Sequence, residues 1–133
     1  MNGEHLYDGH DKATGLHDSV YFCTELEREV AELRRSKKNS HLVALTLSSD
    51  TPVEIVKEVA DWWKEQFIRV CRYEKKPGYI LMGLDESKYA FKKAQELSDV
   101  LKEKYPGLKV DVTGIEIDGD SGSLEELAET LSE

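Results

Sequence analysis

Histidines and acids gather near the start of the chain, in a composition that could coordinate a metal ion. The segment 5–18 supplies His5, Asp8, His10, Asp11, His17 and Asp18. Imidazole and carboxylate groups are ligands for Zn²⁺, but their spacing here matches none of the established zinc patterns. The interpretation we favour is a polar segment without a dedicated metal site.

A second acidic group has a spacing that could suit calcium. Asp118, Asp120 and Glu129 stand at positions one, three and twelve of a calcium loop. An EF-hand needs glycine at position six and a helix in front of the loop. The chain has Ser123 at that position and a predicted strand in front. An acidic turn that leads into a capped helix explains the segment better.

Charged residues also occupy the turn of a predicted β-hairpin, whose strands are expected at 68–73 and 78–84. The turn residues are Glu74, Lys75, Lys76 and Pro77. Together with the carboxylate of Asp50, the lysines could form a pocket for an anionic ligand. The simpler interpretation is that they keep the turn soluble and protect the hairpin end from pairing with other strands.

Composition and charge narrow the class of protein. The chain has 133 residues, of which 39% are hydrophobic and 34% charged, as expected for one soluble globular domain. Its 18 basic and 27 acidic residues give a net charge of −9, which repels phosphate backbones. The richest basic run, RRSKK at 34–38, suits the end of a helix. We therefore expect no nucleic-acid partner.

Hydropathy and cysteine usage indicate the compartment. No apolar run approaches the roughly 20 residues of a membrane span, and the N-terminus lacks the pattern of a secretory signal. Cys23 and Cys71 are isolated in apolar surroundings. They are expected to be buried, reduced thiols of a cytoplasmic protein that has no membrane partner.

Two long helices are predicted before the hairpin. The first spans about 18–38, with Asp18 or Ser19 as its N-cap. Its apolar stripe consists of Phe22, Cys23, Leu26, Val30 and Leu33. The second spans 51–67, where Thr51 is expected to cap and Glu54 to complete a capping box. Its broad apolar face consists of Ile55, Val56, Val59, Trp62, Trp63 and Phe67.

The remaining elements complete an α/β pattern. A buried strand is expected at 41–47, and a helix with Asp85 as its cap follows the hairpin. A half-buried strand covers 108–117, where Gly114 is interpreted as a bulge because the apolar phase shifts after it. Ser123 and Glu126 form the capping box of a short last helix. The order of the middle elements, β-α-β-β-α-β, predicts a ferredoxin-like α+β sandwich at 11–133, after a loosely ordered segment 1–10.

Several motifs in consistent order resemble GGDEF domains, the diguanylate cyclase family. The opening turn of that family matches Asp11, Thr14, Gly15 and Leu16. Its signature hairpin matches Arg72 and Tyr73, and then Ile80, Leu81 and Met82 after the turn. The positions of the signature itself hold Glu74, Lys75, Lys76, Pro77 and Gly78. The resemblance covers nearly the whole chain and implies the fold of that family.

The resemblance also implies that the catalytic parts have been replaced. The family binds two metal ions with signature acids and an aspartate of the first strand; Lys76 and Pro77 stand at the former, Thr46 and Ser48 at the latter. One predicted helix replaces the two that precede the family's hairpin. The Arg-x-x-Asp of the family's product-inhibition site aligns with Glu65 and Ile68.

We therefore expect a bacterial, cytoplasmic, non-catalytic GGDEF-like domain that acts in signalling through contact with proteins and needs no cofactor. Its partner would be another protein or a fused sensor or receiver domain, and a homodimer is also open. Trp62 and Trp63 are the candidate contact residues. The alternative is a nucleotide- or anion-binding domain with a pocket rebuilt at the hairpin turn.

Overall fold

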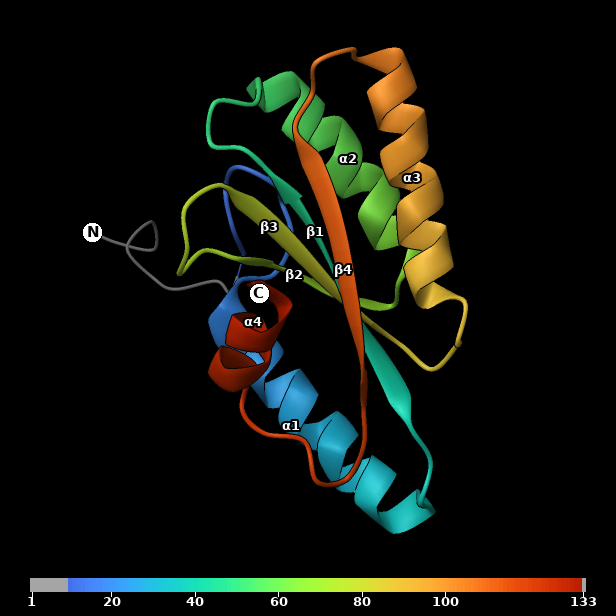
Figure 1. Cartoon of the computed structure of the whole chain (residues 1–133). Helices are drawn as coiled ribbons and strands as arrows, with labels where there is room; N and C mark the ends of the chain where they lie inside the picture. Colours follow the sequence, from blue (N-terminus) through green and yellow to red (C-terminus); the bar gives the residue numbers. More distant parts are fainter. Residues whose placement is uncertain (1–9, 133) are drawn as a thin grey trace, which may run out of the picture.

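The computed structural model describes residues 10–132 (Figure 1). Its elements are α1 (Ser19–Ser36), β1 (Ser40–Leu47), α2 (Val53–Gln66), β2 (Arg69–Tyr73), β3 (Tyr79–Asp85), α3 (Ala90–Lys104), β4 (Val110–Ile117) and α4 (Leu124–Ser132). Residues 1–9 of the predicted loose segment, which include His5 and Asp8 of the possible metal site, lie outside the described part. No helix within 10–132 combines the length and the apolarity needed to cross a bilayer.

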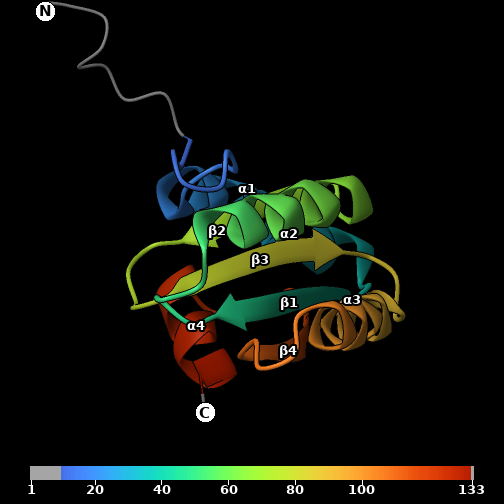
Figure 2. The same ribbon diagram turned by 90° about the horizontal axis from the view of Figure 1, so that it is seen from above.

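The strands form one antiparallel sheet in the order β2-β3-β1-β4. The helices α2 and α3 lie side by side on one face of this sheet, and α1 and α4 cover the other face (Figures 1 and 2). The predicted ferredoxin-like order, with flanking helices at both ends, is therefore confirmed.

The central strand β1 supplies side chains to both halves of the core. Val43 and Leu45 pack under α2 and α3, whereas Leu42 and Ala44 pack under α1 and α4. Neighbouring residues of a strand point to opposite faces, and both faces are covered here. This burial on both sides explains why β1 is a continuous apolar run rather than an alternating one.

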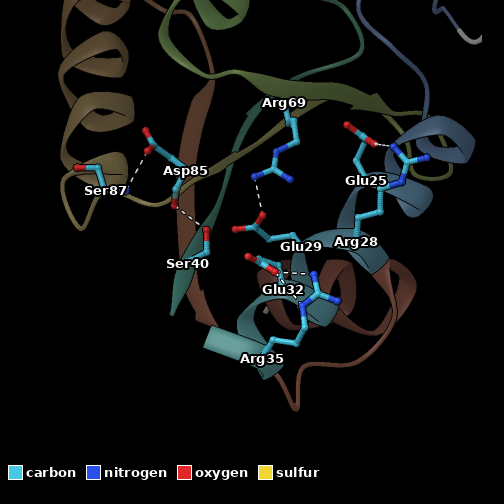
Figure 3. A network of polar contacts seen from close by, with 9 residues as sticks. All are labelled: Glu25, Arg28, Glu29, Glu32, Arg35, Ser40, Arg69, Asp85 and Ser87. Carbon is cyan, nitrogen blue, oxygen red and sulfur yellow. Dashed lines mark hydrogen bonds and ion pairs between the residues drawn. The ribbon is translucent and has the colours of Figure 1, made fainter. Parts of the chain in front are cut away.

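A partly buried ion pair joins α1 to the edge strand β2 (Figure 3). The side chain of Glu29 is 6% exposed, and its Oε1 lies 2.6 Å from Nη2 of Arg69. By contrast, the pairs Glu25–Arg28 and Glu32–Arg35 lie within α1 itself, three residues apart along its outer surface (Figure 3). Glu29 thus fixes the position of the helix on the sheet, and the surface pairs support only the helix.

Two predicted helix caps are wrong. Helix α2 begins after Pro52, whose side chain offers no acceptor to cap it, and the hydroxyl of Thr51 instead lies 3.3 Å from that of Ser48. Asp85 is the last residue of β3 and accepts a hydrogen bond from the Ser87 backbone, because α3 begins only at Ala90. In both places the residue expected to cap the helix stabilises the preceding turn instead. Thr51 donates its backbone N–H to the Ser48 carbonyl, and Asp85 accepts that of Ser87.

The predicted bulge at Gly114 is also wrong. The β1–β4 register runs without interruption, with Gly114 opposite Val43. A Cβ atom on Gly114 would lie 2.9 Å from Cδ1 of Phe91, so the glycine allows the first turn of α3 to approach the sheet closely. The apolar phase changes along β4 because Val112 packs toward α2 and α3, whereas Ile115 packs toward α1 and α4.

Candidate functional site

The opening turn of the described chain is closed by its own side chains. One carboxylate oxygen of Asp11 accepts hydrogen bonds from the backbone N–H and the hydroxyl of Thr14, both at 2.9 Å. Gly15 has a φ of +76°, which a residue with a Cβ rarely adopts, and Leu16 enters the core at 2% exposure. The rings of His10 and His17 stack with centroids 4.4 Å apart.

Arg72 fastens this turn to the base of the β2–β3 hairpin. Its Nη1 lies 3.0 Å from the second carboxylate oxygen of Asp11, and its Nη2 donates to the carbonyl of Gly78. The guanidinium also lies over the ring of Tyr79, 4.6 Å from the centroid. The opening turn and the hairpin, which each resemble a separate motif of GGDEF domains, are thus in direct contact.

The hairpin turn then contacts the start of α1 through Glu74. Its carboxylate accepts the backbone N–H of Ser19 at 3.0 Å and also the hydroxyl of Ser19. Ser19 is the first residue of α1 and is fully buried. The N–H groups at a helix start have no partner within the helix. Asp18, the expected N-cap, accepts that of Tyr21, and Glu74 accepts that of Ser19 as a second cap from a distant part of the chain.

The two lysines of the turn pair with α4. Nζ of Lys75 lies 3.3 Å from Glu125, and Nζ of Lys76 lies 3.0 Å from Glu129. The backbone N–H of Glu125 and the ammonium of Lys75 hold the pKa of Glu125 below its usual value, and the hydrogen bond to Glu125 raises the pKa of Lys75. Besides the expected solubility and protection of the hairpin end, these lysines therefore form ion pairs within the fold, because α4 folds back to the hairpin end (Figure 1).

Replacing Glu74 by alanine is expected to lower the free energy of unfolding by about 1–2 kcal/mol, because buried Ser19 would lose its charged acceptor. The measurement is urea unfolding followed by circular dichroism. Glu74→Gln keeps an acceptor and should lose clearly less. Lys75→Ala is the control at the neighbouring position, and we expect little change because its ion pair is exposed. If the glutamine and alanine variants lost the same free energy of unfolding, the Glu74 side chain would not be acting as an acceptor for Ser19.

The end of β1 carries hydroxyl groups where the resemblance implies metal-binding acids. Thr46 and Ser48 are both half-buried. The hydroxyl of Ser48 donates to the carboxylate of Asp50, which lowers the pKa of Asp50. Within residues 10–132, no group of three or more His, Cys, Asp or Glu side chains gathers in a way that could hold a metal ion.

A hollow of about 490 Å³ lies beside this loop. Its lining residues are Ser48, Asp50, Thr51, Pro52, Ile55, Lys104, Tyr105, Pro106, Gly107, Leu108 and Lys109. They come from the β1–α2 loop with the first turn of α2 and from the end of α3 with the α3–β4 connection, and no residue of the hairpin turn is among them. Asp50 therefore does not share this hollow with Glu74, Lys75 and Lys76, with which the alternative interpretation combined it in a rebuilt pocket.

The two tryptophans have different environments. Trp63 is fully buried and donates its indole N–H to the carbonyl of Met82 at 3.0 Å, so it is not available to a partner. Trp62 is half-buried and lines a hollow of about 470 Å³ between α2 and α3. The α3 side of this hollow, with Leu97 and the 59% exposed Val100, was not predicted. The available signal was Val100 itself, an apolar residue that follows the helical spacing of the buried Leu97 and Leu101 but lies beside them.

The residues aligned with the family's product-inhibition site lie around the end of α2. Glu65 is exposed in the last turn of α2, and Ile68 follows the helix with 97% exposure. A carboxylate and an aliphatic side chain supply no guanidinium for a phosphate group.

Comparisons with known proteins show the fold. No family model matches the sequence, and no curated protein does. The GGDEF domain of FimX from Pseudomonas aeruginosa is 16% identical, with a TM-score of 0.68 over 95% of this chain and 90% of that one. The GGDEF domain of DgcB from Caulobacter crescentus, solved in complex with c-di-GMP, is 16% identical, with a TM-score of 0.64 over 99% and 89%.

A third solved structure agrees with these two. A sensory box/GGDEF family protein from Caulobacter crescentus CB15 is 15% identical, with a TM-score of 0.63 and 93% of each chain covered. The chain therefore has the fold of GGDEF domains, as the sequence motifs implied. At such identities the likeness concerns the fold and not the activity.

Proposed function

We propose that this chain, whose fold is that of GGDEF domains, is a non-catalytic signalling module that regulates other proteins by contact. The observation that carries the proposal is the use of the hairpin turn. Glu74 caps α1, while Lys75 and Lys76 pair with α4. The turn that would bind metal and triphosphate in a cyclase is occupied by contacts within the fold.

The chemistry of the donor atoms supports the same conclusion. Two divalent cations on a triphosphate require carboxylate oxygens, because hard cations prefer charged oxygen ligands. The aligned positions supply the ammonium of Lys76, the ring of Pro77 and the hydroxyls of Thr46 and Ser48. A lysine ammonium repels a cation, and proline has no side-chain ligand. Diguanylate cyclase activity is therefore not expected.

The single helix before the hairpin supports the proposal as well. The resemblance implies that a cyclase reads guanine with residues on two helices, and here α2 alone connects β1 to β2. Its inward face, with Val56, Val59 and Trp63, is buried in the core. Because this face is packed against the sheet, it cannot line a pocket for a base.

A reducing compartment fits the state of the cysteines. Cys23 and Cys71 are free thiols, and burial raises the pKa of Cys71 well above its usual value. Thiols of this kind persist where disulfides do not form. We place the module in the bacterial cytoplasm, with another protein, a sensor or receiver domain, or a second copy as its partner.

Nucleotide binding is the direct test, measured by calorimetry and by thermal shift with millimolar GTP and Mg²⁺ and with cyclic di-GMP. A ligand at 100 times its dissociation constant stabilises the folded state by about 2.7 kcal/mol, a shift on the order of 10 °C for a domain of this size. We expect no heat of binding and no shift. An active GGDEF cyclase in the same buffers is the positive control.

A shift with GTP that disappears in Lys76→Ala would contradict the proposal. It would favour instead a nucleotide- or anion-binding domain whose turn still contacts phosphate. A shift that Lys76→Ala leaves intact would contradict the proposal equally, and would place the nucleotide away from the hairpin.

A further inference from the structure

A groove lies between α2 and α3. These two helices cover the face of the sheet opposite to α1 and α4 (Figure 1). It has a volume of about 470 Å³. Its lining residues are Glu58, Val59, Asp61, Trp62, Glu65, Glu96, Leu97, Val100, Leu101 and Lys104. The groove lies away from the hairpin turn, so its function does not depend on the signature positions.

The centre of the groove is apolar. Leu97 and Leu101 are buried beneath it, while Trp62 is half-buried and Val100 is 59% exposed. An indole side chain offers a large, stiff contact area at a small cost in conformational entropy, which is why tryptophan is frequent among residues that dominate binding. Trp62 and Val100 thus offer apolar contacts from both helices.

The rim of the groove is strongly acidic. Four of the lining residues carry carboxylates and one, Lys104, carries an ammonium group, while Asp61 also pairs with Lys64 of the same helix at 3.5 Å. Lys104 is 2.6 Å from Glu58, and its hydrogen bond, together with one from the hydroxyl of Tyr105, lowers the pKa of Glu58. Glu65 and Glu96 are exposed and have no ion pair within the described residues. Their negative charge is available to a cationic partner.

We propose that this groove binds a basic amphipathic helix of a partner protein, an inference that rests on the proposed interaction function. Apolar residues three and four positions apart on that helix would contact Trp62 and Val100, and its lysines or arginines would contact Glu65 and Glu96. Both walls of the groove are helices, whose backbone groups are already paired, so an added β-strand has no edge to join. Nucleic acid and anionic membranes are repelled by the acidic rim.

The probe is a synthetic helical peptide of about 18 residues, built from leucine and lysine with an amphipathic pattern. Its matched control replaces every lysine by glutamate. Titration into the whole chain is followed by calorimetry and by tryptophan emission. We expect the basic peptide to bind, with an affinity that falls as salt rises, and the acidic peptide not to bind. Failure of the basic peptide to bind would overturn the inference.

Variants separate the groove from the general negative charge of the chain. Trp62→Ala and the double variant Glu65→Lys, Glu96→Lys should each weaken binding on the order of tenfold or more. The double variant Glu27→Lys, Asp120→Lys changes net charge equally through exposed residues of the α1 and α4 side, and should change affinity little. Equal weakening by this control, or no effect of Trp62→Ala, would overturn the proposed site.

Failure of the groove proposal can be distinguished from failure of the proposed function. Nucleotide binding would contradict the non-catalytic assignment, whether or not the peptides bind. Absence of both nucleotide and peptide binding would remove only the groove, and would leave the interaction module with another surface.

Discussion

Replacing Trp63 by alanine is expected to lower the free energy of unfolding by about 4 kcal/mol. The indole is fully buried between α2 and the sheet, and its ring centroid lies 4.7 Å from that of Phe67. Its N–H donates to the Met82 carbonyl. The variant loses this hydrogen bond and leaves a cavity between α2 and the sheet. Urea unfolding followed by circular dichroism at the helix band measures the loss, because tryptophan emission changes with the substitution itself.

The adjacent Trp62→Ala is the matched control for that measurement. It removes the same side chain from the same helix, but from a half-buried position at the α2–α3 groove. We expect a loss of about 1 kcal/mol or less, since part of the indole is already in water. Similar losses in the two variants would contradict the burial described here, and with it the claim that only Trp62 is available to a partner.

Gly78→Ala is expected to destabilise the fold by about 2–3 kcal/mol. Gly78 has a φ of +87°, and a Cβ atom added there would lie 2.7 Å from the carbonyl oxygen of Leu47. The left-handed conformation costs an L-residue roughly 1–2 kcal/mol, and the clash is with backbone that cannot move without disturbing the β1–β3 pairing. Thermal and urea unfolding of the variant measure the sum.

Gly15→Ala separates the two contributions. Gly15 has a similar φ of +76°, but an added Cβ would meet nothing within 4 Å. Its expected loss, about 1–2 kcal/mol, is therefore the conformational strain alone. If Gly78→Ala cost no more than Gly15→Ala, the close approach of the hairpin end to β1 would be refuted. Gly78 occupies the last signature position of the resemblance, so the comparison also measures how far that position now serves the fold.

Local patterns in the sequence were sufficient for most elements. The stripe Phe22, Leu26 and Val30 of α1 and the face Val59 and Trp63 of α2 are buried as their helical spacing predicted. The capping box of the last helix is present, since the Ser123 hydroxyl accepts the N–H of Glu126 at 3.3 Å. These features depend on residues within a few positions of one another, and short-range spacing encodes them directly.

The wrong predictions of helix caps and of the bulge concern choices between competing partners. Thr51 and Asp85 have the chemistry of helix caps, but each closes a turn because its helix begins later. Gly114 has the chemistry of a bulge, but its missing side chain accommodates Phe91 of α3. Local propensity identifies what such a residue can do, and the packing of distant elements selects one of the possibilities.

The candidate site divides in the same way. The sequence by itself determined which groups are absent from the signature positions, because the resemblance places Lys76 and Pro77 there without regard to geometry. It also identified Trp62 and Trp63 as candidate contact residues, and neighbouring residues of a helix point in different directions, so the packing of α2 decides which of them is buried.

Only the tertiary structure decided what the charged turn does and where a partner could bind. Glu74 and Ser19 are 55 positions apart, and the lysines meet α4 at the far end of the chain. Trp62 faces Val100 and Glu96 because α2 and α3 share one face of the sheet. Such contacts follow from strand order and helix placement, which bring together side chains whose separation along the chain carries no periodic signal.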